Sequence, residues 1–458
     1  MSAGDVERHA GLSRAIAAWL PQARWYGDRA AAEVTVADAC AADGVTLALV
    51  DARPSPDGRP VRYVVPVTSD TGGDAACTPA CARWLVDVMT TGRVVPGMQG
   101  SFVGHPMGDA AAFPAAPLAV SPLGADASNT SCLVQTATAG YVVKLLRRCR
   151  EGVQPEVEVG EFFARQSSFT ATPRLRGWLE YRPAAGGPTT ALATIHDHLP
   201  GCESAWDVLG RLLAERGLDG PHRDRIMAIV AAIGRVTADM HAALAARSDV
   251  PSFAPVEVTP DDRLATAADL VAHATSVLSV AASAGSLPAP IAARVRRVVD
   301  AREALCDQLR GVADVLPARL IRVHGDFHLG QVLVAAADDR VFVIDFEGEP
   351  GRTLEARRAF APAAKDVAGM CRSFDYLARH ARLPNPAAVA AMLGHRFRAA
   401  YVSKAAGHAW WPADAARFLG SGKQAMATGK ACASLRGDLR PSCSPVVAAV
   451  SDRRARLP

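Results

Sequence analysis

The stretch over residues 322–348, RVHGDFHLGQVLVAAADDRVFVIDFEG, constrains this chain more than any other part of its sequence. Two apolar runs joined by a polar segment predict a short β-hairpin. Asp326 precedes this hairpin, and Asp345 follows it, with Glu347 and a further glutamate close behind. Carboxylates gathered around so small a hairpin repel one another unless cations lie between them, so the stretch predicts a site for Mg²⁺.

The same residue types occur in the same order in protein kinases. There an Asp accepts the proton of the attacking hydroxyl, an amide side chain five residues on binds one Mg²⁺, and a second Asp beyond a short hairpin binds the metals. Asp326, Gln331 and Asp345 take these places, with Gln for the usual Asn and DFE for DFG. We therefore predict Asp326 as the catalytic base, and Gln331 and Asp345 as metal ligands. A surface hairpin that merely carries acids would not require the whole set at this spacing.

Three segments, VHGDFHLGQVL, IDFEGEPGRTLEARR and KDVAGMCRSFDY, resemble the maltokinases and the actinobacterial glucosamine kinases. Both groups are aminoglycoside-phosphotransferase-like kinases, and the resemblance is dense over residues 322–376 and thinner elsewhere. It implies an α+β, bilobal protein-kinase-like fold with an N-terminal α+β cap domain. It also implies an ATP- and Mg²⁺-dependent sugar kinase, in which Asp366 braces the catalytic loop.

The length of 458 residues is enough for two or three domains. We expect three parts: a cap domain at 1–110, a β-rich, ATP-binding kinase N-lobe at 111–200, and a helical C-lobe with the catalytic hairpin and sugar site at 201–458. Within the cap, hydrophobic patterning predicts a helix at 12–20 and strands at 34–37, 45–50 and 61–67. The Gly-, Ala- and Pro-rich residues 92–122 predict a connecting segment.

Lys144 lies within the apolar, strand-like run YVVKLL, where an unpaired ammonium would be costly. It therefore needs an acidic partner, as in kinases, where the strand Lys pairs with a helix Glu and reaches the α- and β-phosphates. The helical segment 155–166 offers Glu158, with Glu156 and Glu161 as competing candidates. The resemblance favours Glu158, because GVQPEVEVGEFF places it at the matching position.

The predicted phosphate-covering residues are Ser128, Asn129 and Thr130. SNTS occupies the place of a Gly-rich loop, as it does in maltokinases, and its hydroxyl and N–H groups suit phosphate oxygens. A plain β-turn would have the same composition.

The predicted hinge follows an apolar run at 191–195. There the backbone of His196, Asp197 and His198 would read adenine. The two histidines have no third ligand nearby, which does not favour zinc.

The tentative substrate residues are Asp326, His328, Glu347, Asp414 and Asp438. In maltokinases a C-terminal helix rich in Tyr, Glu and Lys contributes to the sugar site. The comparable segment here has no Tyr or Trp after Trp411, while isolated acids suit a sugar ammonium through charge-assisted hydrogen bonds. We predict glucosamine as the substrate, phosphorylated on its 6-hydroxyl. Maltose, phosphorylated on its anomeric hydroxyl, is the alternative.

Other classes of function fit less well. An aminoglycoside phosphotransferase normally needs a strongly acidic C-lobe, whereas this tail is Arg-rich, and a pseudokinase would not keep the catalytic set. A net charge of +4 without a Lys/Arg stripe gives no nucleic-acid surface. Without a signal peptide or an apolar run of membrane-spanning length, we expect a cytoplasmic, monomeric protein with no membrane partner. The ten scattered cysteines indicate reduced thiols.

Overall fold

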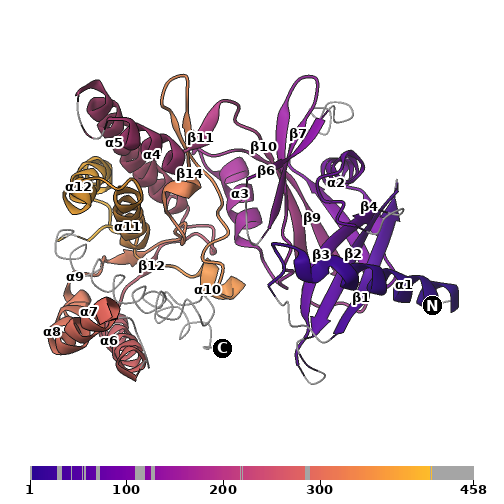
Figure 1. Ribbon diagram of the computed structural model, residues 1–458, viewed down its shortest axis with the longest axis horizontal. Coiled ribbons are helices and arrows are strands. Elements are labelled where there is room, and N and C mark those ends of the chain that lie inside the picture. Colours follow the sequence, from indigo (N-terminus) through magenta and orange to yellow (C-terminus); the bar gives the residue numbers. More distant parts are fainter. Residues whose placement is uncertain are drawn as a thin grey trace. The chain divides into compact units, whose positions relative to one another are not determined.

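The computed structural model describes residues 3–27, 33–42, 44–53, 55, 58–68, 73–108, 119–124, 129–216, 218, 220–283, 289–412 and 414. The chain divides into two compact units, and Figure 1 labels their helices and strands. Unit 1 comprises Met1–Gln166 and Pro173–Pro200, and unit 2 comprises Ser167–Thr172 and Gly201–Pro458.

The N-terminal part of unit 1 is an antiparallel sheet of three strands, β1 (Glu33–Ala42), β2 (Val45–Arg53) and β3 (Val61–Thr68). These strands confirm the three β-runs expected in this region. In β2, Leu47 and Leu49 belong to one hydrophobic cluster, whereas Ala48 and Val50 belong to a second, which includes Ile16 of helix α1 (Ala3–Trp19). Successive side chains of a strand point to opposite faces, so both faces of this sheet are covered.

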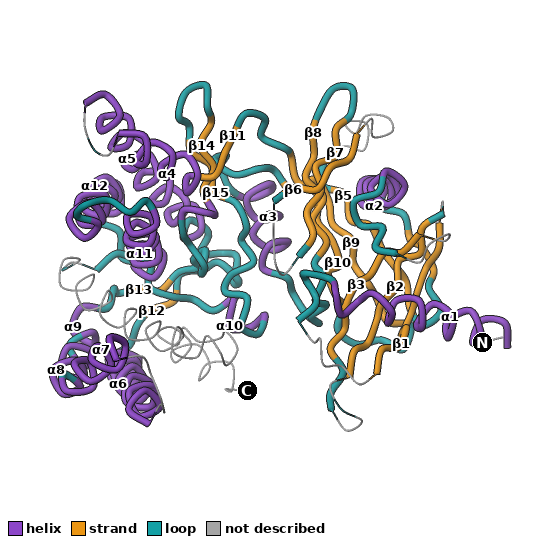
Figure 2. Tube along the Cα trace, viewed as in Figure 1, coloured by secondary structure: helices purple, strands orange, loops and turns teal. Residues whose placement is uncertain are grey.

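The second sheet of unit 1 has seven strands, which are among those drawn in orange in Figure 2, and all its neighbouring strands pair antiparallel. Its order is β4 (Val94–Pro96), β5 (Gly100–Pro106), β9 (Leu175–Pro183), β10 (Thr190–Asp197), β8 (Gly140–Leu145), β7 (Thr130–Gln135) and β6 (Ala119–Leu123). Helix α2 (Pro79–Thr91) packs against β5 and β9, and helix α3 (Pro155–Gln166) also contacts β9.

The expectation of a connecting segment at 92–122 is wrong for the strands that the structure places there. Its glycines are explained by close packing instead of by a loop. A Cβ on Gly104 would lie 1.7 Å from the backbone oxygen of Val88 in α2, and one on Gly100 would lie 2.4 Å from the oxygen of Arg182 in β9. Only glycine allows the helix and the neighbouring strand to approach β5 so closely.

Unit 2 is largely helical and contains the predicted hairpin. Its three-stranded sheet has the order β11 (Cys202–Ser204), β14 (Val332–Ala335), β15 (Val341–Val343), and β14 and β15 form the hairpin. A two-stranded ladder joins β12 (Val256–Glu257) to β13 (Arg319–Leu320). The helices are α4 (Ala205–Arg216), α5 (Gly220–Leu244), α6 (Pro260–Ser283), α7 (Ala289–Asp300), α8 (Arg302–Arg310), α9 (Val312–Val315), α10 (Leu354–Arg358), α11 (Ala364–His380) and α12 (Pro386–Ala405).

One described helix, α5, contains a stretch long and apolar enough to span a membrane, His222–Leu244. This differs from the expectation that no apolar run reaches membrane-spanning length. Within α5, Ile226, Ile229 and Val230 are fully buried, and the helix packs against α12 and α4. A buried core helix satisfies the same test of length and composition. The eight described cysteines are all free thiols, as expected.

Candidate active site

In unit 1, Lys144 forms a buried ion pair with Glu156. Its Nζ donates to Glu156 Oε2 at 2.8 Å, and the two side chains are only 9% and 7% exposed. Lys144 lies in β8 between β7 and β10, opposite Ser131 on one side and Thr194 on the other. This central position buries the ammonium, which explains why it requires a carboxylate partner.

The prediction of Glu158 as this partner is wrong, and the competing candidate Glu156 is the residue that pairs. The phase of helix α3 is the reason. Glu156 shares a face with Val159 and Phe163, three and seven residues on, and all three are buried. Glu158 is rotated away from this face and is only partly buried.

The predicted hinge residues lie at the end of β10, where several of their groups are already engaged. The Asp197 carboxylate accepts two hydrogen bonds from Arg176, at 2.7 and 2.9 Å. The N–H groups of Asp197 and His198 donate to the oxygens of Arg174 and Gly140. Reading of adenine by these two N–H groups would therefore require breaking existing hydrogen bonds.

The remaining histidine of this segment, His196, has its Nε2 3.9 Å from Glu156 Oε1, which places it beside the buried ion pair. Burial lowers the pKa of His198, which favours the neutral ring.

The predicted phosphate-covering residues are only partly described. Ser128 lies outside the described residues. Asn129 is buried, and Thr130 begins β7 with its hydroxyl accepting a hydrogen bond from Arg147 Nε at 2.8 Å. Their roles toward a nucleotide stay predictions.

In unit 2, the catalytic loop is held by the carboxylate of Asp366 in α11. It accepts hydrogen bonds from the backbone N–H of His324 at 2.8 Å and of Gly325 at 3.0 Å. His241 of α5 lies 3.0 Å from the same carboxylate and 2.7 Å from the Tyr401 hydroxyl. These contacts give Asp366 the bracing position that the resemblance implied and make His241 a hydrogen-bonding residue.

The charge state of Asp366 follows from these contacts. Full burial acts to raise the pKa of this carboxyl, but the hydrogen bond and charge of His241, the charge of His324 and the N–H of Gly325 outweigh it. The pKa of Asp366 therefore lies below its usual value, and the loop is held by a carboxylate.

The loop is also fixed from within by its own side chains. His324 Nε2 lies 2.9 Å from the backbone oxygen of Ile344, which can only accept, so the ring carries its proton on Nε2. This bond ties the start of the loop to the residue before Asp345. The hydroxyl of Ser373 in α11 accepts from the N–H of Leu329 at 3.1 Å. Both ends of the loop are therefore anchored.

Asp326 is partly exposed on this anchored loop. Among the described residues, no hydrogen bond or ion pair engages its carboxylate. Phe327, the next residue, is buried, and its backbone oxygen lies so close to α11 that a Cβ on Gly369 would be 2.6 Å away. The loop thus fixes the backbone of Asp326, and its side chain is partly exposed.

Gln331 and Asp345 lie together at the ends of the hairpin. Gln331 Nε2 donates to Asp345 Oδ2 at 2.7 Å, and the backbone N–H of Ile344 donates to the backbone oxygen of Gln331 at 3.0 Å. Asp345 has a φ of 67°, one of three described non-glycine residues with a positive φ. A left-handed backbone costs an ordinary side chain free energy, and such strain is concentrated at functional sites. It turns the Asp345 carboxylate toward Gln331.

The two nearby glutamates are each opposed by an arginine. Glu347 lies 3.6 Å from Arg357 Nη1, and Glu349 lies 3.2 Å from Arg352 Nε. Burial lowers the pKa of Arg357 against the charges of the surrounding carboxylates, with Glu347 first among them. The negative charge of the hairpin is therefore partly balanced within the protein.

The structure places two further predicted substrate residues, His328 and Asp414, in unit 2. His328 begins the 3₁₀ turn at Leu329–Gln331, and its Nδ1 accepts from the N–H of Gly330 at 3.0 Å. Asp414 is exposed, and Asp438 lies outside the described residues. The sugar-binding roles of these residues stay predictions.

Two residues of α11 that lie beside this loop were not predicted from the sequence. Ser373 is a buried hydroxyl on the apolar face of α11, and a polar residue at such a position is a signal that could have been noticed. Lys365 precedes Asp366; burial lowers its pKa, while Glu349, Asp366 and Asp326 act to raise it. It adds a cation beside the acidic loop.

A β-rich unit with a buried strand-Lys to helix-Glu pair, and a helical unit with a braced acidic hairpin, define a protein-kinase-like phosphotransferase fold. The chain belongs to the phosphotransferase enzyme family (APH). The sequence pattern of this family matches residues 119–348.

Named relatives are similar to this chain over part or all of its length. A glucosamine kinase of Streptacidiphilus jiangxiensis is 35% identical over 56% of this chain and 53% of that protein. One of Mycolicibacterium smegmatis is 29% identical over 56% of this chain and 59% of that protein. The chain thus spans little more than half the length of these two relatives. A solved glucosamine kinase in complex with glucosamine, ADP and inorganic phosphate is 25% identical, with a TM-score of 0.62, over 97% of this chain and 99% of that chain.

Proposed function

We propose that this protein is an ATP-dependent kinase that transfers the γ-phosphoryl group to the 6-hydroxyl of glucosamine. The observation that carries this proposal is the likeness to the solved glucosamine kinase complex, which extends over nearly the whole of both chains. The two curated relatives carry the same name. The braced loop around Asp326 supports the reaction class, because phosphoryl transfer mainly requires a positioned base and positioned charges.

In this mechanism Asp326 accepts the proton of the attacking sugar hydroxyl. Its backbone is held by the hydrogen bonds that Asp366 accepts from the two preceding residues. Lys144, held in place by Glu156, would direct its ammonium to the phosphate oxygens of the nucleotide. The chain itself thus supplies a base and a fixed cation.

Gln331 and Asp345 would hold Mg²⁺. Their side chains meet at 2.7 Å, and their carboxylate and amide oxygens are the donors that this hard cation prefers. The bound metal would neutralise the charge of the phosphate oxygens.

The preference for an amine-bearing sugar rests on acids near the C-terminal end of the chain. A carboxylate such as Asp414 or Asp438 would accept a hydrogen bond from a sugar ammonium, and such a charge-assisted bond is about twice as strong as a neutral one. A cytoplasmic location and a monomeric state remain part of this proposal.

The test is a comparison of kcat/KM for glucosamine, glucose, maltose and kanamycin, with ³¹P NMR of each product. We expect glucosamine to be the preferred substrate and to give a 6-phosphate. Asp326→Asn should lower kcat by about a hundred- to ten-thousand-fold while MgATP still binds. Preference for maltose with an anomeric phosphate would replace the proposal with maltokinase activity. Preference for kanamycin would replace it with antibiotic modification.

A further inference from the structure

Arg147 is a fully buried arginine that the proposed mechanism does not use. It is the largest of the described side chains that are fully buried. A guanidinium stays protonated inside a protein, so its burial requires a compensating carboxylate and further acceptors. These partners come from parts of unit 1 that are far apart in the sequence.

The N-terminal segment provides most of the partners. Arg147 Nη2 donates to Asp74 Oδ2 at 2.6 Å, and its guanidinium carbon lies 4.1 Å from the ring centroid of Trp25. Trp25 Nε1 donates to the same Asp74 oxygen at 3.2 Å. The backbone oxygen of Arg147 also accepts from the N–H of Val64 in β3 at 2.9 Å. Arg147 is thus bonded to the three-stranded sheet and to the loops around it.

A further partner of Arg147, besides the backbone oxygen of Val64 at 3.4 Å, is Thr130, one of the predicted phosphate-covering residues. Arg147 Nε donates to the Thr130 hydroxyl at 2.8 Å. Thr130 is paired with Leu145 at one end of the β7–β8 ladder, and the next pair is Ser131 with Lys144. The bond therefore acts on the part of the ladder from which Lys144 would reach the nucleotide.

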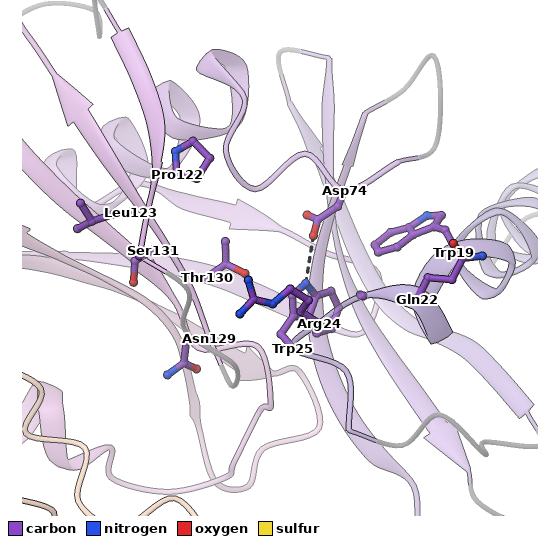
Figure 3. Close-up of a pocket in the computed structure, with 12 residues that line it drawn as sticks. Trp19, Gln22, Arg24, Trp25, Asp74, Pro122, Leu123, Asn129, Thr130 and Ser131 are labelled. Carbon is purple, nitrogen blue, oxygen red and sulfur yellow. Dashed lines mark hydrogen bonds between the residues drawn. The ribbon is translucent and has the colours of Figure 1, made fainter. Parts of the chain in front are cut away.

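The residues that Arg147 contacts, Trp25, Asp74 and Thr130, also line a pocket of about 420 Å³ (Figure 3). Trp25 and Arg24 of the N-terminal segment line it together with Asn129 and Thr130, and Asp74, bonded to Trp25, lies above them in this view. The pocket is therefore lined by both the N-terminal segment and the start of β7. The Arg147 cluster, which consists of Trp25, Asp74, Thr130 and Arg147, connects these two segments through hydrogen bonds and the contact of Arg147 with the Trp25 ring.

We propose that Arg147 is a positioning residue through which the N-terminal segment fixes Thr130 for binding of the ATP phosphates. This inference rests on the proposed ATP-dependent kinase function and gives the N-terminal sheet a part in it. Arg147 has the geometry for this role because one planar group can hold Asp74, Trp25 and Thr130 at once, which a lysine cannot do.

The experiment measures the Kd of MgATP and of adenosine, without any sugar, by titration calorimetry on the full chain. The variants are Arg147→Lys, Thr130→Val, their combination and Asp74→Asn. We expect Arg147→Lys and Asp74→Asn each to weaken MgATP binding about fivefold or more, the lower end of typical coupling between sites. Adenosine lacks the phosphates, so its Kd should stay within twofold of wild type.

The combined variant tests whether Arg147 acts through Thr130. If it does, Arg147→Lys should add little once Thr130→Val has removed the hydroxyl, because the two changes break the same connection. Asp51→Asn is the matched control. It neutralises a carboxylate that pairs with Arg62 at 2.7 Å in the same N-terminal sheet and does not belong to the Arg147 cluster. It should leave both Kd values unchanged.

Two results would overturn the inference. The first is an MgATP Kd within twofold of wild type in folded Arg147→Lys and Asp74→Asn. The second is equal weakening of MgATP and adenosine, which would show a general structural role. Because no sugar is present, wild-type protein that binds MgATP but does not phosphorylate glucosamine would instead refute the proposed substrate and leave this inference standing.

Discussion

Neutralising Glu156 should damage this protein far more than neutralising Glu158, although the two glutamates lie two residues apart in α3. Glu156→Gln keeps the shape of the side chain and leaves the Lys144 ammonium buried beside a neutral amide. Removing one partner of a buried ion pair costs about 3–5 kcal/mol. The hydrogen bond that the amide oxygen can still accept returns about 1 kcal/mol of this, so we expect a loss of about 2–4 kcal/mol. Both side chains are less than a tenth exposed, so solvent screens little of the effect.

This loss should appear in two measurements. At about 2–4 °C per kcal/mol for a unit of this size, the Tm of unit 1 should fall by roughly 4–16 °C in thermal unfolding followed by circular dichroism. If the misplaced Lys144 no longer reaches the phosphates, kcat/KM for ATP should fall as well, because a fixed cation at the phosphates is lost. Glu158→Gln is the matched control and should change neither quantity by much.

The reasoning would be refuted by a Glu158→Gln variant that loses as much activity as Glu156→Gln. It would also be refuted if Glu156→Gln kept wild-type Tm and kcat/KM. Either result would mean that the ion pair at 2.8 Å does not hold Lys144 for its role.

Three further predictions concern unit 2. Asp345→Ala should raise the Mg²⁺ concentration needed for half-maximal activity more than Gln331→Ala, because only Asp345 brings a formal charge; identical Mg²⁺ titrations in both variants and wild type would show that neither binds the metal. Asp366 has a lowered pKa in the folded state, so as the pH falls the unfolded chain binds the proton of this residue first. The free energy of unfolding should therefore decrease as the pH drops below about 4. Denaturant unfolding measured at several pH values should show a smaller decrease in Asp366→Asn. Gly369→Ala should displace the catalytic loop and lower kcat about tenfold or more, since small shifts in a positioned group are costly; Gly210→Ala, whose new methyl meets only a side-chain atom at 3.5 Å, should keep wild-type kcat.

The sequence predicted the catalytic hairpin well because every step there is local. The spacing of Asp326, Gln331 and Asp345 fixes their positions on a short loop and two paired strands, and the structure brings Gln331 and Asp345 to 2.7 Å. The alternation of apolar residues likewise predicted the strands β1–β3. These features depend on neighbours that are close in the chain.

The partner of Lys144 depends on something that local patterns do not contain. Two glutamates in one helical turn compete, and the choice between them depends on which face of α3 packs inward. Tertiary packing buries Val159 and Phe163, and this decides which face of α3 points inward. The family resemblance, which compares residue types along the sequence, favoured Glu158 instead.

The prediction of a connecting segment over the glycines of β5 was wrong for a related reason. Their composition is the same in a linker and in a strand that a helix approaches closely, and only the packing of α2 distinguishes the two.

Strands β4 and β5 have a consequence for how this gene can be shortened or recombined. They come from the first 106 residues of the chain, yet they extend the same sheet as the strand that carries Lys144. A product that began after β5 would leave β9 as an unprotected edge over its whole length, with Leu179 and Tyr181 stripped of the cover that Phe102 and α2 give them. Such edges pair with other chains and aggregate. Natural exchange of the N-terminal segment should therefore succeed only at breakpoints before β4, where no ladder of this sheet is cut.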